Sequence, residues 1–294
     1  MRKTAATLFV LLLAPAVLAN CGGDDEDDTA TTPAREEVGA PAVTKVTITA
    51  EDYGFDVPPT FKGGLVELDY RNAGQEPHFA AFAAIGGGKT AADVKAALTA
   101  PPSNTPPAGP PPFEDYAGMA TMDPGGAANA ILNLPAGGYV LYCAIPAPDG
   151  VPHVAKGMAA EVTVSEGADG DLPETEGTFT ATDFKLSDGP ELKTAGRHVV
   201  GLSNEGKQFH EIDLIELPEG KTVDDVSPWF KQPSGPPPMR MLGGPAITPG
   251  EEVTTTYDLK AGVTYAFICG IPDFLGDFVA HVSKGMHTGT FTVS

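Results

Sequence analysis

Short runs in which apolar and polar residues alternate recur along most of the chain. Examples are VTKVTITA, LVELDY, AEVTV, VTTTYDL and GTFTV. Alternation with a period of two is typical of strands that bury one face. The runs are separated by segments rich in glycine and proline, which favour turns. The pattern therefore predicts an all-β fold built from sandwiches or barrels.

Two segments depart from this pattern and predict short helices. They read KTAADVKAAL at 89–98 and KTVDDVSPWF at 221–230. In each, a threonine precedes a first turn that contains aspartate, which is a signal for the start of a helix. A proline-rich loop follows each segment. We therefore expect one short helix to be inserted into each of two sandwiches, at an end where loops are tolerated.

The N-terminus carries the features of an export signal. Arg2 and Lys3 precede the apolar run LFVLLLAPAVLA, which predicts a signal peptide at 1–20. LAN before Cys21 resembles a bacterial lipobox, and this resemblance implies lipidation of Cys21. The acidic segment at 21–42 has too few large apolar residues to fold, so we expect a disordered tether. The predicted location is extracytoplasmic, lipid-anchored to the bacterial cell membrane or, alternatively, secreted with Cys21 as a free thiol.

The rest of the chain contains two copies of one unit. TAEDYGF at 49–55 matches TATDFKL at 180–186, RNAGQEPH matches SNEGKQFH, and HVAKGM matches HVSKGM. The interval between copies is far longer than the period of stacked repeats, which indicates domain duplication. We predict a first domain at 43–165, a polar linker at 166–176 and a second domain at 177–294.

The residues that the two copies share include a set of candidate metal ligands. The chain has six histidines, and four of them stand at equivalent places, as do two cysteines and two methionines. Soft sulfur ligands combined with imidazole select copper, and two His, one Cys and a weak Met are typical of blue-copper sites. The candidate ligands, for up to two copper ions per chain, are His78, Cys143, His153 and Met158, and His210, Cys269, His281 and Met286.

The spacing of these residues explains how they could meet. Cys143 ends the predicted strand YVLYC, and the Pro/Gly segment AIPAPDGVP reverses the chain. His153 and Met158 then lie on the returning loop, so that one hairpin presents three ligands to one point. His78 comes from the end of a distant strand.

This order of residues resembles the cupredoxin family, and the resemblance covers each copy nearly end to end. It rests on NAGQEPH followed much later by Cys, Pro-His and Gly-Met. The resemblance implies a Greek-key β-sandwich, type 1 copper held by the eight residues above, and single-electron transfer. The chain departs from the family pattern in two places. The loops from cysteine to histidine are longer than in small cupredoxins, and Phe79 and Glu211 replace a small polar residue.

Simpler roles for these residues also fit the sequence. Cys143 and Cys269 could form a disulfide, as exported cysteines often do. The sulfur-containing side chains could also be ordinary core packing, or the second copy could have lost its metal. His198 and His287 have no counterpart in the other copy, and we expect them at the surface or at a strand edge. Four methionines follow the proline runs: Met119, Met122, Met239 and Met241. We expect them to lie in loops and to pack there, with Cu(I) binding as the alternative.

The overall charge and the residues next to the cysteines limit the possible partners and activities. A net charge of −21 disfavours nucleic acid as a partner and favours a redox partner protein with a basic surface. Tyr142 and Ile268 stand before the cysteines, where multicopper enzymes carry histidine, so we predict that the chain is not an enzyme. Electron transfer is the predicted function, with His153 or His281 as the exposed exit. Copper storage or delivery, or a metal-free binding module, are the alternatives.

Overall fold

The structure, a computed structural model, describes residues 42–100, 112–187, 189–231 and 236–294. The predicted signal peptide at 1–20, the lipidation site Cys21 and all but the last residue of the tether at 21–42 lie outside these residues. Among the helices that are described, none has both the length and the apolar character needed to cross a bilayer.

Strands dominate both halves, as predicted. In the first half the strands are β1 (Thr44–Glu51), β2 (Gly54–Asp56), β3 (Thr60–Lys62), β4 (Gly64–Asn72), β5 (His78–Ile85), β6 (Phe113–Met122), β7 (Ala127–Leu134), β8 (Gly137–Tyr142) and β9 (Ala159–Ser165). In the second half they are β10 (Thr178–Thr182), β11 (Lys185–Ser187), β12 (Gly196–Asn204), β13 (His210–Glu211), β14 (Asp213–Leu217), β15 (Arg240–Met241), β16 (Pro245–Ile247), β17 (Glu252–Leu259), β18 (Thr264–Ile268) and β19 (Phe291–Thr292).

Each half also contains the one short α-helix that the sequence predicts. These are α1 (Ala91–Leu98) and α2 (Val223–Val226), and α2 continues into a 3-10 turn, η2 (Ser227–Lys231). Thr90 and Asp93 form a reciprocal capping box at the start of α1, and Thr222 donates to Asp225 at the start of α2. Such boxes satisfy N–H groups that have no partner within the helix. The prediction of an all-β fold with one inserted helix per half is confirmed.

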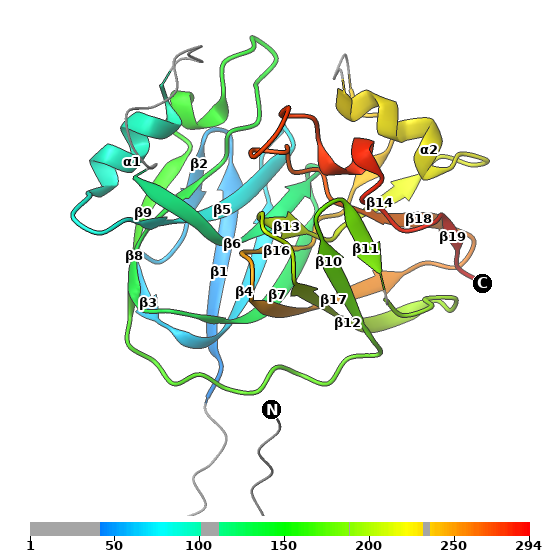
Figure 1. Ribbon diagram of the computed structural model, residues 1–294, viewed down its shortest axis with the longest axis horizontal. Helices are drawn as coiled ribbons and strands as arrows, with labels where there is room; N and C mark the ends of the chain where they lie inside the picture. The colour runs from blue at the N-terminus through cyan, green and yellow to red at the C-terminus, as the bar shows by residue number, and fades with distance from the viewer. Residues whose placement is uncertain (1–41, 101–111, 188, 232–235) are drawn as a thin grey trace, which may run out of the picture. The chain divides into compact units, whose positions relative to one another are not determined.

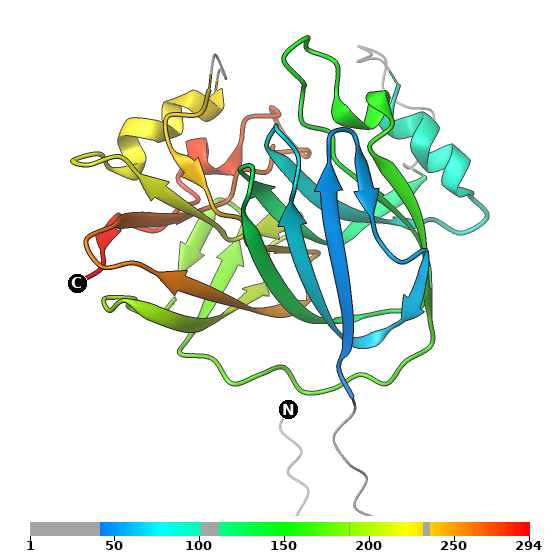
Figure 2. The same cartoon turned by 180° about the vertical axis from the view of Figure 1, so that it is seen from behind.

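The sheets run across the boundary between the two halves. One sheet has the order β11-β10-β12-β17-β7-β4-β1-β2, and another has the order β13-β16-β6-β5-β8-β9-β3 (Figure 1). A smaller sheet of β15-β14-β18-β19 completes the second half. Figure 2 shows the first of these sheets from behind, with β1 in blue. The two copies are therefore joined by strand pairing as well as by the chain.

The joint consists of two pairs of strands, and we call it the seam. Strand β17 pairs with β7 through Val253 and Leu132, and β16 pairs with β6 through Ile247 and Ala117. Asn129 adds one side-chain bond across the seam, since its Oδ1 accepts the N–H of residue 256 at 3.0 Å. The domain limits predicted at 165 and 177 therefore divide the chain within a continuous sheet.

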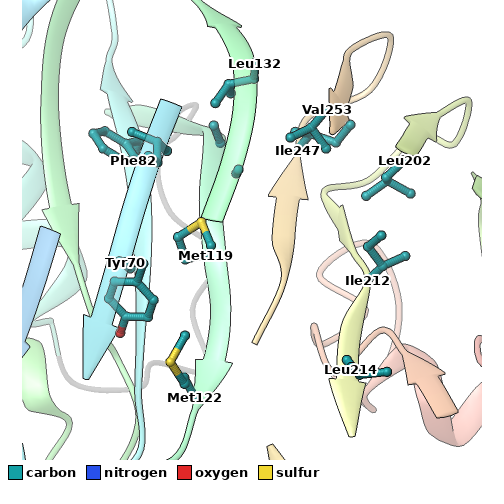
Figure 3. Packing of buried hydrophobic residues seen from close by; sticks show 14 of the residues in the cluster. Tyr70, Phe82, Met119, Met122, Leu132, Leu202, Ile212, Leu214, Ile247 and Val253 are labelled. Carbon is teal, nitrogen blue, oxygen red and sulfur yellow. The ribbon is translucent and has the colours of Figure 1, made fainter. Parts of the chain in front are cut away.

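One hydrophobic core spans both halves. It contains β1 and β4 residues such as Ile48 and Leu68, which pack with Phe82 from the facing sheet, and it continues to Leu202 in the second half. Figure 3 shows the part of this core on either side of the seam. The prediction that the four methionines lie in loops is wrong for three of them, since Met119 and Met122 belong to β6 and Met241 to β15. All four are buried, as ordinary packing requires.

The predicted linker at 166–176 is hydrogen-bonded to both halves. The carbonyl of Ala168 accepts the N–H of Leu65 at 3.0 Å, and the N–H of Glu176 donates to the carbonyl of Val199 at 2.9 Å. Gly170 exchanges two hydrogen bonds of 3.0 Å with the side chain of Asn133. Because its backbone groups have partners on the sandwich, this segment is held along the molecule instead of hanging free.

Candidate metal centres

Each half brings one cysteine and two histidines together. In the first half, Cys143 Sγ lies 3.6 Å from His153 Nδ1, and that nitrogen lies 3.0 Å from His78 Nδ1. The three side chains are fully buried, and their ligand atoms lie within 4.8 Å of one another. We name these three residues the first centre. Two ring nitrogens and one sulfur at this spacing fit a copper ion.

The second half repeats the arrangement. Cys269 Sγ lies 3.3 Å from His281 Nδ1 and 3.8 Å from His210 Nδ1. All three side chains are again fully buried, with ligand atoms within 4.8 Å of one another. We name these residues the second centre. The six predicted nitrogen and sulfur ligands therefore meet in two groups of three, as their order in the sequence indicates.

The elements that position the ligands are the same in both copies. His78 opens β5, Cys143 follows the last residue of β8, and His153 opens the 3-10 turn η1 (His153–Lys156). The corresponding turn in the second copy is η3 (His281–Lys284). A strand end and the start of a returning turn therefore present cysteine and histidine from one hairpin.

A glycine ends each of these turns and places the methionine. Gly157 has φ 112° and Gly285 has φ 100°, a left-handed conformation that favours glycine. The carbonyl of the methionine that follows accepts the N–H of the cysteine, at 3.3 Å for Met158 and 3.1 Å for Met286. Both methionine side chains are fully buried. Each methionine thus lies beside its cysteine, and its role as a copper ligand stays a prediction.

The loop before the first histidine is also shaped by a glycine. A Cβ atom on Gly74 would lie 2.7 Å from His78 Nε2 and 2.4 Å from Asp52 Oδ1. A Cβ on Gly206 would lie 2.6 Å from His210 Nε2. Such contacts are shorter than packed atoms allow, so glycine is required where the loop crosses the ring. This explains the spacing from glycine to histidine in NAGQEPH and SNEGKQFH.

Carboxylates contact the outer nitrogens of the first centre. Asp52 Oδ1 lies 2.8 Å from His78 Nε2, and Glu76 Oε2 lies 2.8 Å from His153 Nε2. Tyr53 donates its hydroxyl to Glu76 Oε1 at 2.9 Å. A carboxylate on the outer nitrogen fixes the ring and its tautomer, leaving Nδ1 available for a metal.

The second centre has only one of these contacts. Asp183 Oδ1 lies 3.3 Å from His210 Nε2. The other outer nitrogen, His281 Nε2, is buried without a hydrogen-bond partner among the described residues. Burial lowers the pKa of His281 to about 4, and neighbouring His210 adds to this effect. The two centres therefore share their ligands and differ around them.

Burial makes both cysteine thiols hard to ionise. It raises the pKa of Cys143 to about 12, while the backbone N–H groups of Ile145 and Phe79 act in the opposite direction. Burial also raises the pKa of Cys269 well above its usual value. The N–H groups of Ile145 and Phe79 lower the pKa of Cys143 because hydrogen bonds to a thiolate stabilise its charge.

Two buried acids lie beside the second centre. Glu211 Oε1 accepts the N–H of Gly270 at 2.8 Å, and Asp213 Oδ1 accepts the N–H of Gly243 at 3.0 Å. Burial raises the pKa of Glu211 to about 7 and that of Asp213 well above its usual value. In the first copy Phe79 occupies the place of Glu211, so this feature belongs to one centre.

Several alternatives from the sequence are resolved by these positions. Cys143 and Cys269 are both free, so the disulfide alternative is wrong. The expectation that His153 or His281 is exposed is also wrong, since both are fully buried. His198 is buried as well, with Nδ1 at 2.9 Å from a Glu176 oxygen and Nε2 at 2.9 Å from a carbonyl oxygen. These bonds fix a strand and leave no ring nitrogen for a metal.

The sequence interpretation missed the carboxylates around the rings. Asp52 and Asp183 stand at the same position of TAEDYGF and TATDFKL. A repeated aspartate near a repeated histidine was therefore the available signal. Glu76 gave no such signal, because the second copy carries Gln208 at that position.

Comparisons with known proteins give matches among solved structures alone. No family model matches the chain, and no curated protein matches it. Dithionite-reduced auracyanin from Roseiflexus castenholzii is 25% identical over 43% of this chain and 99% of that chain, with a TM-score of 0.28. A multicopper oxidase is 16% identical over 86% and 89%, with a TM-score of 0.25. Copper nitrite reductase from Nitrosomonas europaea is 14% identical over 86% and 94%, with a TM-score of 0.24.

These matches correct one prediction. Two of the matched proteins are enzymes by name, so the prediction that the chain is not an enzyme is contradicted. It rested on the lack of a histidine next to Cys143 and Cys269. That lack removes one ligand for a further copper and does not exclude catalysis.

Proposed function

We propose that this protein binds copper at its two centres, as type 1 sites, and transfers single electrons. The observation that carries the proposal is the convergence, in both halves, of one cysteine sulfur and two Nδ1 atoms within 4.8 Å. Soft sulfur with imidazole is the donor set that copper favours. Copper, when bound, supplies the change between the Cu(I) and Cu(II) states.

The surrounding residues are suited to hold such a site in one geometry. Asp52 and Glu76 fix both rings of the first centre through their outer nitrogens. Cys143 and Met158 are linked through their backbones. Full burial of the ligands keeps water away and leaves little space for rearrangement. A site that moves little between two oxidation states favours fast electron transfer.

Location and partners are proposed on the sequence alone. The export signal and the lipobox-like LAN before Cys21 support an extracytoplasmic protein that is anchored to the membrane through lipid on Cys21. The net charge of −21 supports a redox partner with a basic surface, since opposite charges steer association. Cys21→Ser should abolish incorporation of labelled fatty acid during growth if this is correct.

The test of the proposed function is copper content combined with spectroscopy. Purified protein loaded with Cu(II) should bind two copper ions per chain and show intense thiolate-to-copper absorption. The single variants Cys143→Ser and Cys269→Ser should each keep one copper, and the double variant should keep none. Protein that binds no copper contradicts the proposal. Tight Cu(I) binding without a reversible redox couple would instead indicate copper storage or delivery.

A further inference from the structure

The two centres differ at one position that faces an outer ring nitrogen. Glu76 Oε2 lies 2.8 Å from His153 Nε2 in the first centre. Gln208 occupies the equivalent position in the second copy, and its Oε1 accepts the N–H of Leu275 at 3.4 Å. His281 Nε2 is left without a partner among the described residues. The ring therefore faces a carboxylate in one centre and no acceptor in the other.

The difference is not caused by a different backbone. The carbonyl of Glu76 accepts Asn72 Nδ2 at 2.8 Å, and the carbonyl of Gln208 accepts Asn204 Nδ2 at 2.9 Å. The two loops thus have the same internal bond in the same register. The side chain at this position therefore differs in its contact: Glu76 meets the ring, whereas Gln208 accepts the N–H of Leu275.

A second exchange accompanies the first. Tyr53 donates to Glu76 Oε1 at 2.9 Å, and its ring centroid lies 5.0 Å from that of His153. Phe184 occupies the same place in the second copy, with its centroid 5.3 Å from that of His281. Phenylalanine keeps the ring contact and lacks the hydroxyl. Tyrosine and glutamate therefore form a pair that exists in the first centre alone.

On the basis of the proposed copper function, we propose that Glu76, held by Tyr53, is a positioning residue that lowers the reduction potential of the first centre relative to the second. A carboxylate that accepts the Nε2 proton makes the ring more basic at Nδ1. Its negative charge also favours Cu(II), which carries one more positive charge than Cu(I). Both effects stabilise the oxidised state through His153.

The consequence is a direction for the electron within the chain. When both centres hold copper and share one electron, the Glu76 contact favours oxidation of the first centre and reduction of the second, with no further reactant. The first histidines do not cancel this bias, because Asp52 and Asp183 contact them in both centres. Among the contacts that the described residues make to the outer ring nitrogens, the exchange of a carboxylate for no acceptor is confined to His153 and His281. Glu211 and Asp213 lie near Cys269 in the second copy alone, so the effect of Glu76 is measured within one centre at a time.

The test uses chains that keep one centre each. Cys269→Ser leaves the first centre, and Cys143→Ser leaves the second. Glu76→Gln is introduced into the former, and Phe184→Tyr with Gln208→Glu is introduced into the latter. The reduction potential of each protein is measured by spectroelectrochemical titration of the thiolate-to-copper absorption. Changes to groups that bond metal ligands typically alter affinity about 10-fold to 100-fold.

We expect Glu76→Gln to shift the Cu(II)/Cu(I) equilibrium about tenfold toward Cu(I), which equals a rise of about 59 mV for one electron. Tyr53→Phe should shift it in the same direction by less. Phe184→Tyr with Gln208→Glu should shift the second centre toward Cu(II). Glu161→Gln is the control, because it makes the same charge change on a side chain that is 63% exposed. It should leave the potential unchanged.

The outcomes separate this inference from the proposed function. If the wild type binds no copper, the proposed function fails and the inference fails with it. If every variant keeps its copper and its absorption, but Glu76→Gln has the same potential as Glu161→Gln, the inference alone is overturned. If Glu76→Gln does not fold, Tyr53→Phe and the exchanged second centre decide instead. An unchanged reduction potential in both of these proteins would overturn the inference.

Discussion

Asn72 donates a hydrogen bond of 2.8 Å from Nδ2 to the carbonyl oxygen of Glu76. The same nitrogen donates to the carbonyl of Met122 at 2.8 Å, and Oδ1 accepts the N–H of Gly74 at 2.9 Å. Asn72 is buried, so these three backbone groups depend on it. One side chain thus fixes the loop that leads into His78.

Asn72→Ala should destabilise the protein. It leaves buried backbone groups without partners, at a cost of about 1–3 kcal/mol for each unsatisfied group. We expect the free energy of unfolding to fall by about 2–4 kcal/mol, allowing for partial relaxation. Denaturant unfolding of the metal-free protein measures this. The control Asp69→Asn changes a side chain that is 42% exposed and paired only with Arg71 at the surface, so it should change this free energy by less than about 0.5 kcal/mol. Equal effects of the two variants would refute the role of Asn72.

Two histidine substitutions test the assignment of ligands. His78→Ala should reduce the copper content from two ions to one per chain, because it removes one of the three donors of the first centre. His198→Ala should keep both ions, since its ring nitrogens face Glu176 and the carbonyl of Thr194. Elemental analysis of the purified proteins gives the numbers. Loss of copper in His198→Ala, or full retention in His78→Ala, would contradict the assignment.

The pair of Asp115 and Tyr142 predicts a pH dependence of stability. The Tyr142 hydroxyl donates to Asp115 at 3.0 Å, and burial raises the pKa of Asp115 from 3.8 to about 6. The folded state therefore holds this proton more tightly than the unfolded chain does. Stability from this group is present below about pH 4 and is lost as the pH rises through about 6.

Asp115→Asn should remove that loss, because the amide stays neutral. We expect the variant to be more stable than the wild type by about 1–2 kcal/mol at pH 7, and to match it at pH 4. Denaturant unfolding at pH 4, 5.5 and 7 checks both values. The adjacent control Glu114→Gln is exposed and should change stability by less than about 0.5 kcal/mol. If Asp115→Asn were less stable than the wild type at pH 7, the predicted destabilisation by the Asp115 carboxylate would be contradicted.

Because the seam joins the two halves, we expect them to stay together when the segment between them is cleaved. A protease site inserted between Leu172 and Thr175 should allow cleavage without separating the halves, because β6 pairs with β16 and β7 with β17. The cut protein should elute from gel filtration at the position of the intact chain and separate into two bands after denaturation. Dissociation under native conditions would show that the seam is weak.

Much of this architecture is predictable from local patterns. Alternating residues gave the strands, and Thr90 with Asp93 gave the start of α1. The ligand groups were predictable because the same sulfur and imidazole residues recur in the same order in both copies. Repetition mattered, since a lone buried cysteine such as Cys143 is equally well explained by packing.

The features that were not predicted depend on contacts between distant segments. Val253 pairs with Leu132 across the seam. The alternation of apolar and polar residues predicts strands, but it does not indicate which strand edges pair with each other. Burial of His153 was also missed. Its place on the returning loop indicated exposure, whereas Tyr53 and Glu76, about 100 and 77 positions earlier in the chain, lie against the ring.

The seam has a further consequence for a single repeat. Without the second copy, β6 and β7 would both end their sheets with unpaired backbone groups, and such edges associate with other chains. Each repeat therefore protects its twin from aggregation. Leu132 and Ala117 are buried at this seam, whereas Glu76 and Gln208 differ within loops that keep the same glycine and asparagine. A shared edge thus allows one duplicated protein to hold two copper environments.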